Sequence, residues 1–308
     1  MRALLLYLAH NENFKNLMLK VGIFRRLAWR FVAGETLDDA VRVVKEANRQ
    51  AVRGTLDLLG ENTLSLDDAR SATREIAGIL DRIRAEHVDC NVSVKLTQLG
   101  MNLDIQQCLG NLTSIVAHAR QSGIFVRVDM EDSSYTDRTL DVVRRVYAEM
   151  DNVGGVLQAC LYRSENDART MVQEGIRIRL CKGAYLEPDT VAFRKKSDTD
   201  ASFVRIMKLL LDSGLYHAIA THDEAMIAAT REYAESRGIP RERFEFQMLY
   251  GIRRDLQQKL ARDGYNVRIY IPYGSRWYPY LMRRLAERPA NIVFIFGNVV
   301  RETLALKP

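Results

Sequence analysis

The sequence predicts an α/β fold, a (β/α)8 barrel preceded by an N-terminal helical segment. Short runs of β-branched and other apolar residues recur along the chain, and polar stretches with helical periodicity separate them. Such alternation indicates βαβ units with parallel strands, and eight units over about 240 residues match a TIM-type barrel. A doubly wound open sheet is the alternative, and the absence of a G-x-G-x-x-G turn after the first strand weakens it.

The elements follow from the N-terminus. The first 50 residues indicate helix, and Thr36 is placed to cap a helix over Leu37–Ala51. We therefore expect residues 1–50 to form an arm packed on the barrel and residues 51–308 to form the barrel itself. The predicted strands are Thr55–Leu59, Asn91–Leu96, Phe125–Met130, Val156–Leu161, Ile176–Cys181, Ala218–Thr221, Phe244–Leu249 and Val267–Ile271. Helices are predicted between them, for example over Asp67–Ala85, Thr136–Met150 and Asp223–Ser236.

Composition narrows the class of protein. The net charge is +6, but the 45 basic residues are spread along the chain among 39 acidic ones. We interpret most of this charge as solvated surface, with a few cations kept for a site and no nucleic-acid partner. The four cysteines form no C-x-x-C pair, which indicates free thiols. No stretch approaches the roughly 18 apolar residues of a membrane-spanning helix, so we expect a soluble or at most peripheral protein.

Polar side chains stand at the ends of all the predicted strands. In a (β/α)8 barrel the active site lies at the C-terminal ends of the strands, where these side chains would converge. A single polar side chain at a strand end is common in proteins, but polar side chains at the same end of all the predicted strands predict an enzyme. The residues are Asp57, Lys95, Asp129, Gln158, Arg179, Lys182, Thr221, His222, Gln247 and Tyr270.

The expected site is rich in cationic side chains, which favour anionic ligands. Lys95, Arg179 and Lys182 are joined by Arg283 and Arg284 on a helix after the last strand, and arginine suits a planar carboxylate. The five histidines lack metal-site spacing, so no metal is expected. The residues fit a phosphate-bearing cofactor with a small carboxylate substrate. They equally fit a Schiff-base lyase or aldolase using Lys95 or Lys182. A non-catalytic basic binding module is the third possibility.

Six ordered motifs carry a resemblance to a known family. They are SVKL at Ser93–Leu96, RIRLCKGAY at Arg177–Tyr185, ATHDE at Ala220–Glu224, FEFQMLYG at Phe244–Gly251, RIYIPYG at Arg268–Gly274 and YLMRRLAER at Tyr280–Arg288. Over about Arg30 to Ala290 the chain resembles the proline dehydrogenase family, including the proline dehydrogenase part of the bifunctional proline-utilisation flavoenzymes. It looks like the compact bacterial monofunctional branch.

The resemblance implies a role for each matching residue. FAD would lie across the barrel mouth, and Arg283, Arg284 and Lys95 would hold the proline carboxylate. Asp129 matches an acidic residue at the site, to which we assign the orientation of Tyr270 or an arginine, with general base as the alternative role. Arg179 matches the partner of flavin N5. Residues matching the walls around the proline ring are Tyr185, Leu249 and Tyr270, the last favouring proline over hydroxyproline. Residues matching FAD contacts are Met130, Gln158, Arg179, Lys182, Gly183, Ala184, Thr221, His222 and Glu287.

The resemblance also implies a reaction. Hydride would pass from proline C5 to flavin N5 and leave Δ1-pyrroline-5-carboxylate, the first step of proline catabolism to glutamate. The amine should be neutral at that moment, so turnover should be faster at alkaline pH. A membrane quinone would take the electrons, and a separate pyrroline-5-carboxylate dehydrogenase could make transient contact. We therefore expect a cytoplasmic protein, at most peripheral at the inner face of the cell membrane.

Overall fold

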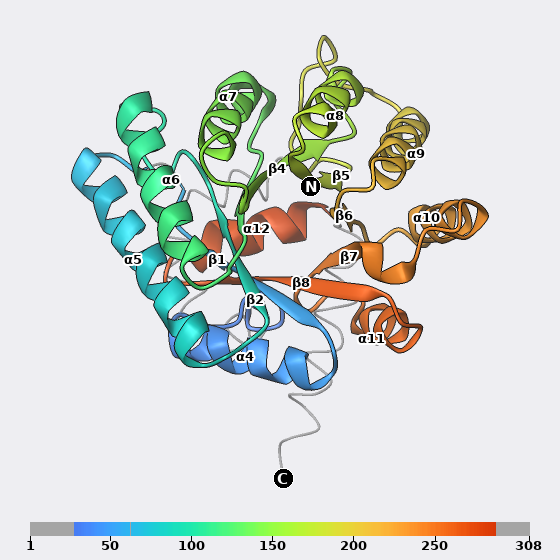
Figure 1. Ribbon diagram of the computed structural model, residues 1–308. Coiled ribbons are helices and arrows are strands. Elements are labelled where there is room, and N and C mark those ends of the chain that lie inside the picture. Colours follow the sequence, from blue (N-terminus) through green and yellow to red (C-terminus); the bar gives the residue numbers. More distant parts are fainter. Residues whose placement is uncertain (1–27, 62, 288–308) are drawn as a thin grey trace.

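The computed structural model describes residues 28–61 and 63–287, without the side chains of residues 283 and 285–287. Its strands form a closed barrel in which β1 to β8 follow one another around the ring (Figure 1). All the neighbouring strands are parallel, and β1 pairs with β8 to close the barrel. The fold class expected from the sequence is thereby confirmed.

The strands lie close to the predicted apolar runs, with ends that differ by a few residues. Their bounds are β1 Arg53–Leu58, β2 Cys90–Val94, β3 Val126–Val128, β4 Val153–Gln158, β5 Arg177–Cys181, β6 His217–Ala220, β7 Phe244–Leu249 and β8 Asn266–Tyr273. The register sets which side chains share a level inside the barrel. Asp57 of β1 stands opposite Ser93 of β2 on one side and Pro272 of β8 on the other.

The helices surround the barrel. Their bounds are α4 Leu37–Arg49, α5 Leu66–Ala85, α6 Ile105–Arg120, α7 Thr136–Tyr147, α8 Ser164–Gln173, α9 Lys196–Asp212, α10 Glu224–Ser236, α11 Arg254–Arg262 and α12 Trp277–Glu287, with 3-10 turns η1 Ser133–Tyr135 and η2 Arg241–Arg243. Thr36 caps α4 as predicted, because its side chain accepts from the Asp39 N–H while Asp39 bonds back to the Thr36 backbone. Buried apolar faces of α4 to α11 and the outer faces of the strands form one continuous core.

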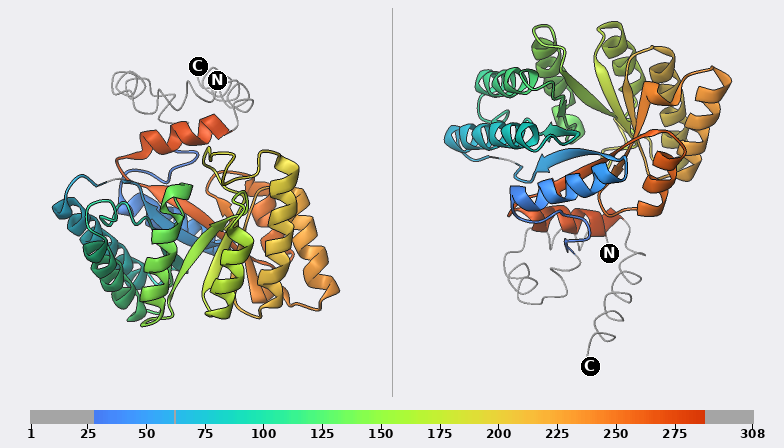
Figure 2. Two further views of the ribbon diagram at one scale, coloured as in Figure 1. Left: turned by 90° about the horizontal axis from the view of Figure 1, so that it is seen from above. Right: turned by 60° about the horizontal axis from the view of Figure 1, so that its bottom comes forward.

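Two helices depart from a simple alternation of strand and helix. α4, which precedes β1, packs against β1 and β8 on the outside of the barrel. α12, which follows β8, lies across one end of the barrel instead of against its wall (Figure 2). A second apolar cluster holds α12 there, formed by Trp277, Tyr278 and Leu281 with Phe31 and Leu59. Because α12 begins after the last strand, it covers the C-terminal ends of the strands, where the site is expected.

The division of the chain at residue 50 stays a prediction. α4 falls within the predicted N-terminal segment and shares the barrel core through Ala40, Val44 and Ala47. Residues 1–27 lie outside the described part of the chain. Within the described part, no helix is both long enough and apolar enough to span a bilayer.

Candidate active site

A cluster of buried charged and polar side chains fills the barrel beneath α12. We call it the mouth cluster, and its members are Asp57, Lys95, Asp129, Arg179 and Tyr270. Their strands and register bring them together from five places in the sequence, and all but Tyr270 are buried. The sequence predicted functional roles for four of these five residues and placed Asp57 among the polar side chains at the strand ends.

Asp129 is the acceptor at the centre of the mouth cluster. Its Oδ2 accepts from the Tyr270 hydroxyl at 2.7 Å and is 3.5 Å from the Lys95 Nζ. Its Oδ1 accepts from Ser93 Oγ at 2.9 Å and forms an ion pair with the Arg179 guanidinium. Asp129 therefore orients both a tyrosine and an arginine.

Lys95 follows the end of β2 and points its ammonium at three acceptors. Nζ donates to Asp57 Oδ1 at 2.9 Å, to the Tyr270 hydroxyl oxygen at 3.3 Å and to Asp129 Oδ2 at 3.5 Å. The ammonium lies 6.0 Å from the centre of the Tyr270 ring, and the Arg179 guanidinium lies 5.3 Å from it. Two cations thus face one aromatic ring inside the barrel, at distances at which each is attracted to the ring.

Burial and charge act against each other on the pKa values of the mouth cluster. Burial raises the pKa of Asp57, and the Lys95 charge only partly offsets it. Burial also favours the neutral form of Asp129, but Arg179 and Lys95 outweigh this effect and lower its pKa. Burial favours neutral Lys95, but the charges of Asp57 and Asp129 raise its pKa. Asp129 and Lys95 are therefore charged at neutral pH.

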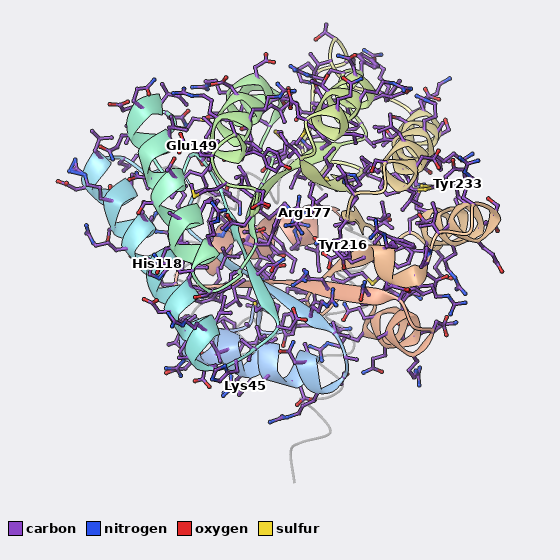
Figure 3. All side chains as sticks on the ribbon, viewed as in Figure 1. Lys45, His118, Glu149, Arg177, Tyr216 and Tyr233 are labelled. Atoms are coloured by element: carbon purple, nitrogen blue, oxygen red, sulfur yellow. The ribbon has the colours of Figure 1, made fainter. Side chains whose placement is uncertain are left out.

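A second buried network lies one level closer to the N-terminal ends of the strands. We call it the base cluster, with members Arg127, Tyr216, Glu245 and Arg268. Arg268 Nε donates to Glu245 Oε1 at 3.0 Å and to Oε2 at 3.1 Å, and its NH1 donates to the Gly54 carbonyl. The Tyr216 hydroxyl donates to Glu245 at 3.1 Å, and Arg127 donates to the carbonyls of Gly155 and Arg177. Figure 3 shows Tyr216 and Arg177 near the centre of the barrel.

Gln247 of β7 joins the two clusters. Its Nε2 donates to Glu245 Oε1 at 2.6 Å, and its Oε1 accepts from Arg179 NH1 at 3.4 Å. Ser93 plays a similar bridging part within the mouth cluster, because its hydroxyl contacts both Asp129 and Arg179. The sequence predicted Gln247 among the polar side chains at the strand ends but gave it no specific role, and Ser93 appeared only within the SVKL motif. The strand period of two could have indicated both residues, because each stands on the same strand face as a polar residue two positions away.

The loop after β5 carries three residues that the resemblance assigns to FAD. Lys182 is held between Asp200 and Asp223, with a distance of 2.7 Å from its Nζ to Asp223 Oδ2. Gly183 is exposed and has a φ of +112°, where L side chains are strained, and a Cβ there would collide with the Cys160 sulfur. Ala184 follows it and is also exposed. The loop therefore presents bare backbone beside a cation.

The remaining predicted FAD contacts lie at the ends of neighbouring strands. Gln158 ends β4 and donates to the Glu131 carbonyl at 2.9 Å, while Met130 is buried after β3. Thr221 and His222 follow β6, and His222 Nε2 accepts from the N–H of Leu249 at 2.9 Å. An accepting Nε2 places the ring hydrogen of a neutral His222 on Nδ1. These residues surround the same end of the barrel as the mouth cluster.

The predicted residues on α12 are described only in part. Arg284 is half-buried, and its guanidinium lies 5.2 Å from the centre of the Tyr280 ring. The side chains of Arg283 and Glu287 lie outside the described residues. Tyr185 is half-buried in the loop after β5. The predicted substrate-binding residues are therefore described on the Lys95 and Tyr270 side and, through Arg284, on the α12 side.

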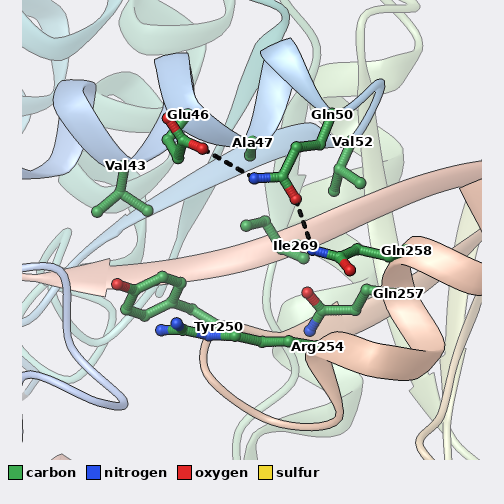
Figure 4. A pocket seen from close by; sticks show the side chains of 10 residues that line it. All are labelled: Val43, Glu46, Ala47, Gln50, Val52, Tyr250, Arg254, Gln257, Gln258 and Ile269. Atoms are coloured by element: carbon green, nitrogen blue, oxygen red, sulfur yellow. Dashed lines mark hydrogen bonds between the residues drawn. The ribbon is translucent and has the colours of Figure 1, made fainter.

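Two further features lie apart from this arrangement. Over the described ranges, no three His, Cys, Asp or Glu side chains gather as a metal site would require. A pocket of about 250 Å³ opens on the outer wall between α4 and α11, with Ile269 of β8 among its lining residues (Figure 4). None of the predicted site residues lines this pocket, so it gives no support to a second location for the site.

Comparisons with known proteins agree with this geometry. The family model described as proline dehydrogenase matches residues 40–295. The chain is 40% identical to proline dehydrogenase 1 of Bacillus subtilis over 98% of its own length and 100% of that protein. It is 41% identical to the proline dehydrogenase of Deinococcus radiodurans, covering 89% of this chain and 90% of that one. Proline utilization A from Bdellovibrio bacteriovorus, in a crystal structure inactivated by N-propargylglycine, has a TM-score of 0.82 at 27% identity, over 90% of this chain and 34% of that chain.

Proposed function

Because this chain is an enzyme of the proline dehydrogenase family, we propose that it oxidises L-proline to Δ1-pyrroline-5-carboxylate with FAD as its cofactor. The observation that supports this most is the mouth cluster, which places two cations, a carboxylate and a tyrosine in the buried end of the barrel beneath α12. We propose a membrane quinone as the final electron acceptor. Contact with a separate pyrroline-5-carboxylate dehydrogenase and a place at the inner membrane face belong to the same proposal.

The residues around the mouth fit a flavin dinucleotide. Bare backbone at Gly183 permits close approach of a phosphate or ring, and the neighbouring Lys182 offers positive charge. Asp200 and Asp223 take up two of the three hydrogens of the Lys182 ammonium, which leaves one for a phosphate oxygen. The residues that would hold FAD are Met130, Gln158, Arg179, Lys182, Gly183, Ala184, Thr221, His222 and Glu287. When bound, FAD would supply the acceptor for the hydride that leaves proline C5.

The side chains of the protein would bind and orient the substrate. Lys95 would contribute one charged hydrogen bond to the proline carboxylate, and Arg283 and Arg284 would contribute the planar donors that suit this group. Tyr185, Leu249 and Tyr270 would form the wall around the ring and exclude water. Asp129 would hold Tyr270 and Arg179 in place through the contacts it already makes. Arg179 would keep a positive charge beside the reacting atoms.

An anaerobic visible spectrum of the purified protein, taken before and after addition of L-proline, tests the proposal. We expect a flavin spectrum that bleaches when proline is added. A flavin spectrum that ignores proline would redirect the substrate to hydroxyproline or another cyclic amine. Absence of flavin after reconstitution with FAD would refute the cofactor. Borohydride trapping at Lys95 or Lys182 with a carbonyl compound would then test the Schiff-base alternative.

The arginines of α12 offer a second test. Replacing Arg284 with Met should raise the KM for proline by about 10- to 100-fold while FAD stays bound, because a charged hydrogen bond to the carboxylate is lost. Arg276→Met is the matched control, since Arg276 is exposed just before α12. Loss of FAD with an unchanged KM in the residual enzyme would contradict the assigned role.

A further inference from the structure

Asp57 has an incomplete set of hydrogen bonds for a buried carboxyl group. It lies on β1 with 1% of its surface exposed. Its Oδ1 accepts from Lys95 Nζ at 2.9 Å, whereas its Oδ2 is buried and has no hydrogen-bond partner among the described residues. An acceptor left without a donor in this way is costly, so a residue at this place needs a reason.

The other two acceptors of Lys95 also bond to other groups. Asp129 accepts from Ser93, Arg179 and Tyr270 in addition to Lys95. The Tyr270 hydroxyl gives its single hydrogen to Asp129, and its contact with Lys95 at 3.3 Å is longer than the contact with Asp57. Among the acceptors of Lys95 that the structure describes, Asp57 thus makes the shortest contact.

The barrel register places Asp57 on the inner side of the Lys95 ammonium. Asp57 stands opposite Ser93, two residues before Lys95 on the same strand face, and therefore nearer the N-terminal end of the barrel. A carboxylate ligand arriving from the mouth would approach Lys95 from the opposite direction. Lys95 can then exchange its longer contacts to Tyr270 and Asp129 for the ligand while its shortest contact stays in place.

We propose that Asp57 is the positioning residue for Lys95, which holds the ammonium at the barrel mouth so that it can bind the substrate carboxylate. This inference rests on the proposed function. In the described cluster, Lys95 contacts the carboxyl groups of Asp57 and Asp129, and Arg179 pairs with Asp129. Without Asp57, Asp129 is the carboxylate that remains beside Lys95, 3.5 Å away, and the ammonium moves toward it. Asp129 and the substrate carboxylate then compete for the same cation.

A double-mutant cycle between Asp57 and Lys95 tests the proposal. Steady-state kcat and KM for L-proline, together with FAD content, are measured for the wild type, Asp57→Asn, Lys95→Met and the double variant. We expect Asp57→Asn to raise KM about tenfold, equal to one lost charge-assisted contact, with kcat within about threefold of the wild type. In the Lys95→Met background the same change should alter KM less than about twofold.

Three companion variants separate the effect of charge from effects on folding and on the surface. Asp57→Glu keeps the charge and should bring KM back to within about threefold of the wild type. Asp57→Ser is measured beside Asp57→Asn, so that the result does not depend on one variant folding. Asp67→Asn is the matched control, because Asp67 lies on α5 with 92% of its side chain exposed.

The outcomes separate the two proposals. If wild-type flavin fails to bleach with proline, the proposed function is wrong and the inference falls with it. If the wild type reacts but Asp57→Asn behaves like Asp67→Asn, only the inference is overturned. An equal rise in KM in the presence and absence of Lys95 would also overturn it, because Asp57 would then act through some other group.

Discussion

The mouth cluster and the base cluster lie at adjacent levels of the same barrel and differ in how completely their groups are bonded. In the base cluster both oxygens of Glu245 accept hydrogen bonds, and the Arg268 guanidinium also reaches a backbone carbonyl. In the mouth cluster one oxygen of Asp57 has no partner among the described residues, and Lys95 makes two contacts longer than 3.2 Å. Buried charge alone therefore does not distinguish a site from a scaffold. The incomplete hydrogen bonding of the mouth cluster indicates that this level of the barrel can accept a ligand.

The largest expected effect comes from breaking the base cluster. Glu245→Gln should lower the free energy of unfolding by about 3–5 kcal/mol, because it leaves the buried Arg268 with only the exposed Asp89, 3.8 Å away, as a counterion. Chemical denaturation measures this loss, with the exposed Glu232→Gln as control. The kcat/KM per folded molecule should stay near the wild-type value. A large loss of kcat/KM at unchanged stability would reverse the roles of the two clusters.

His217, which follows Tyr216 of the base cluster in the sequence, predicts a pH dependence of stability. Burial lowers the pKa of His217 from 6.5 to about 3, and its Nδ1 accepts from the Ile178 N–H at 3.0 Å. The unfolded chain binds this proton more readily than the folded one, so the stabilising effect is complete above pH 6.5 and is lost as pH falls toward 3.

His217→Asn keeps an acceptor near Nδ1 and removes the titration. The difference in unfolding free energy between the wild type and this variant should therefore shrink by about 1.4 kcal/mol per pH unit below pH 6. Equilibrium unfolding at pH 7, 6, 5 and 4 measures it. A difference that stays constant over this range would show that the folded protein binds the His217 proton as readily as the unfolded chain does.

Removing one hydroxyl from the mouth cluster should have a smaller effect, on kinetics more than on stability. Tyr270→Phe deletes the donor to Asp129 and an acceptor of Lys95. We expect kcat/KM for proline to fall about three- to tenfold, and stability to change by about 1 kcal/mol, since Asp129 keeps Lys95, Ser93 and Arg179 as donors. Tyr265→Phe serves as control, because Tyr265 lies in the apolar core and outside the mouth cluster. An unchanged kcat/KM would remove Tyr270 from the proposed substrate wall.

The smallest effect is expected at the link between the clusters. Gln247→Leu removes the amide that contacts both Glu245 and Arg179. Stability should fall by about 1 kcal/mol and KM should change less than about threefold, because each partner keeps stronger contacts of its own. Denaturation and steady-state kinetics on the same sample measure both. A loss as large as that of Glu245→Gln would mean that the two clusters act as one unit.

Much of the fold was predictable from the sequence, because its signals are local. The apolar runs marked the strands, and the Thr36 cap marked the start of α4. Polar residues at strand ends likewise predicted Lys95, Asp129, Arg179 and Tyr270, which the closed barrel brings into contact.

The base cluster was not predicted, although Glu245 and Arg268 stand two residues before Gln247 and Tyr270 in their strands. Alternation along a strand tells that both residues of such a pair share a face. It does not tell which strand levels meet across the barrel, since that depends on the register and on closure. The contacts of Lys182 with Asp200 and Asp223 could not be predicted for the same reason, because they join the end of β5 to a residue of α9 and to the N-cap of α10.

The pairing of β1 with β8 has a consequence for how the chain is made. A ribosome releases β1 first, yet the strand that completes its hydrogen bonds is the last to emerge. Until then the growing chain carries an unpaired strand edge and an open apolar core, the conditions under which nascent proteins aggregate. Stalled chains that end before β8 should therefore be held by chaperones, and release of the finished chain should coincide with their departure.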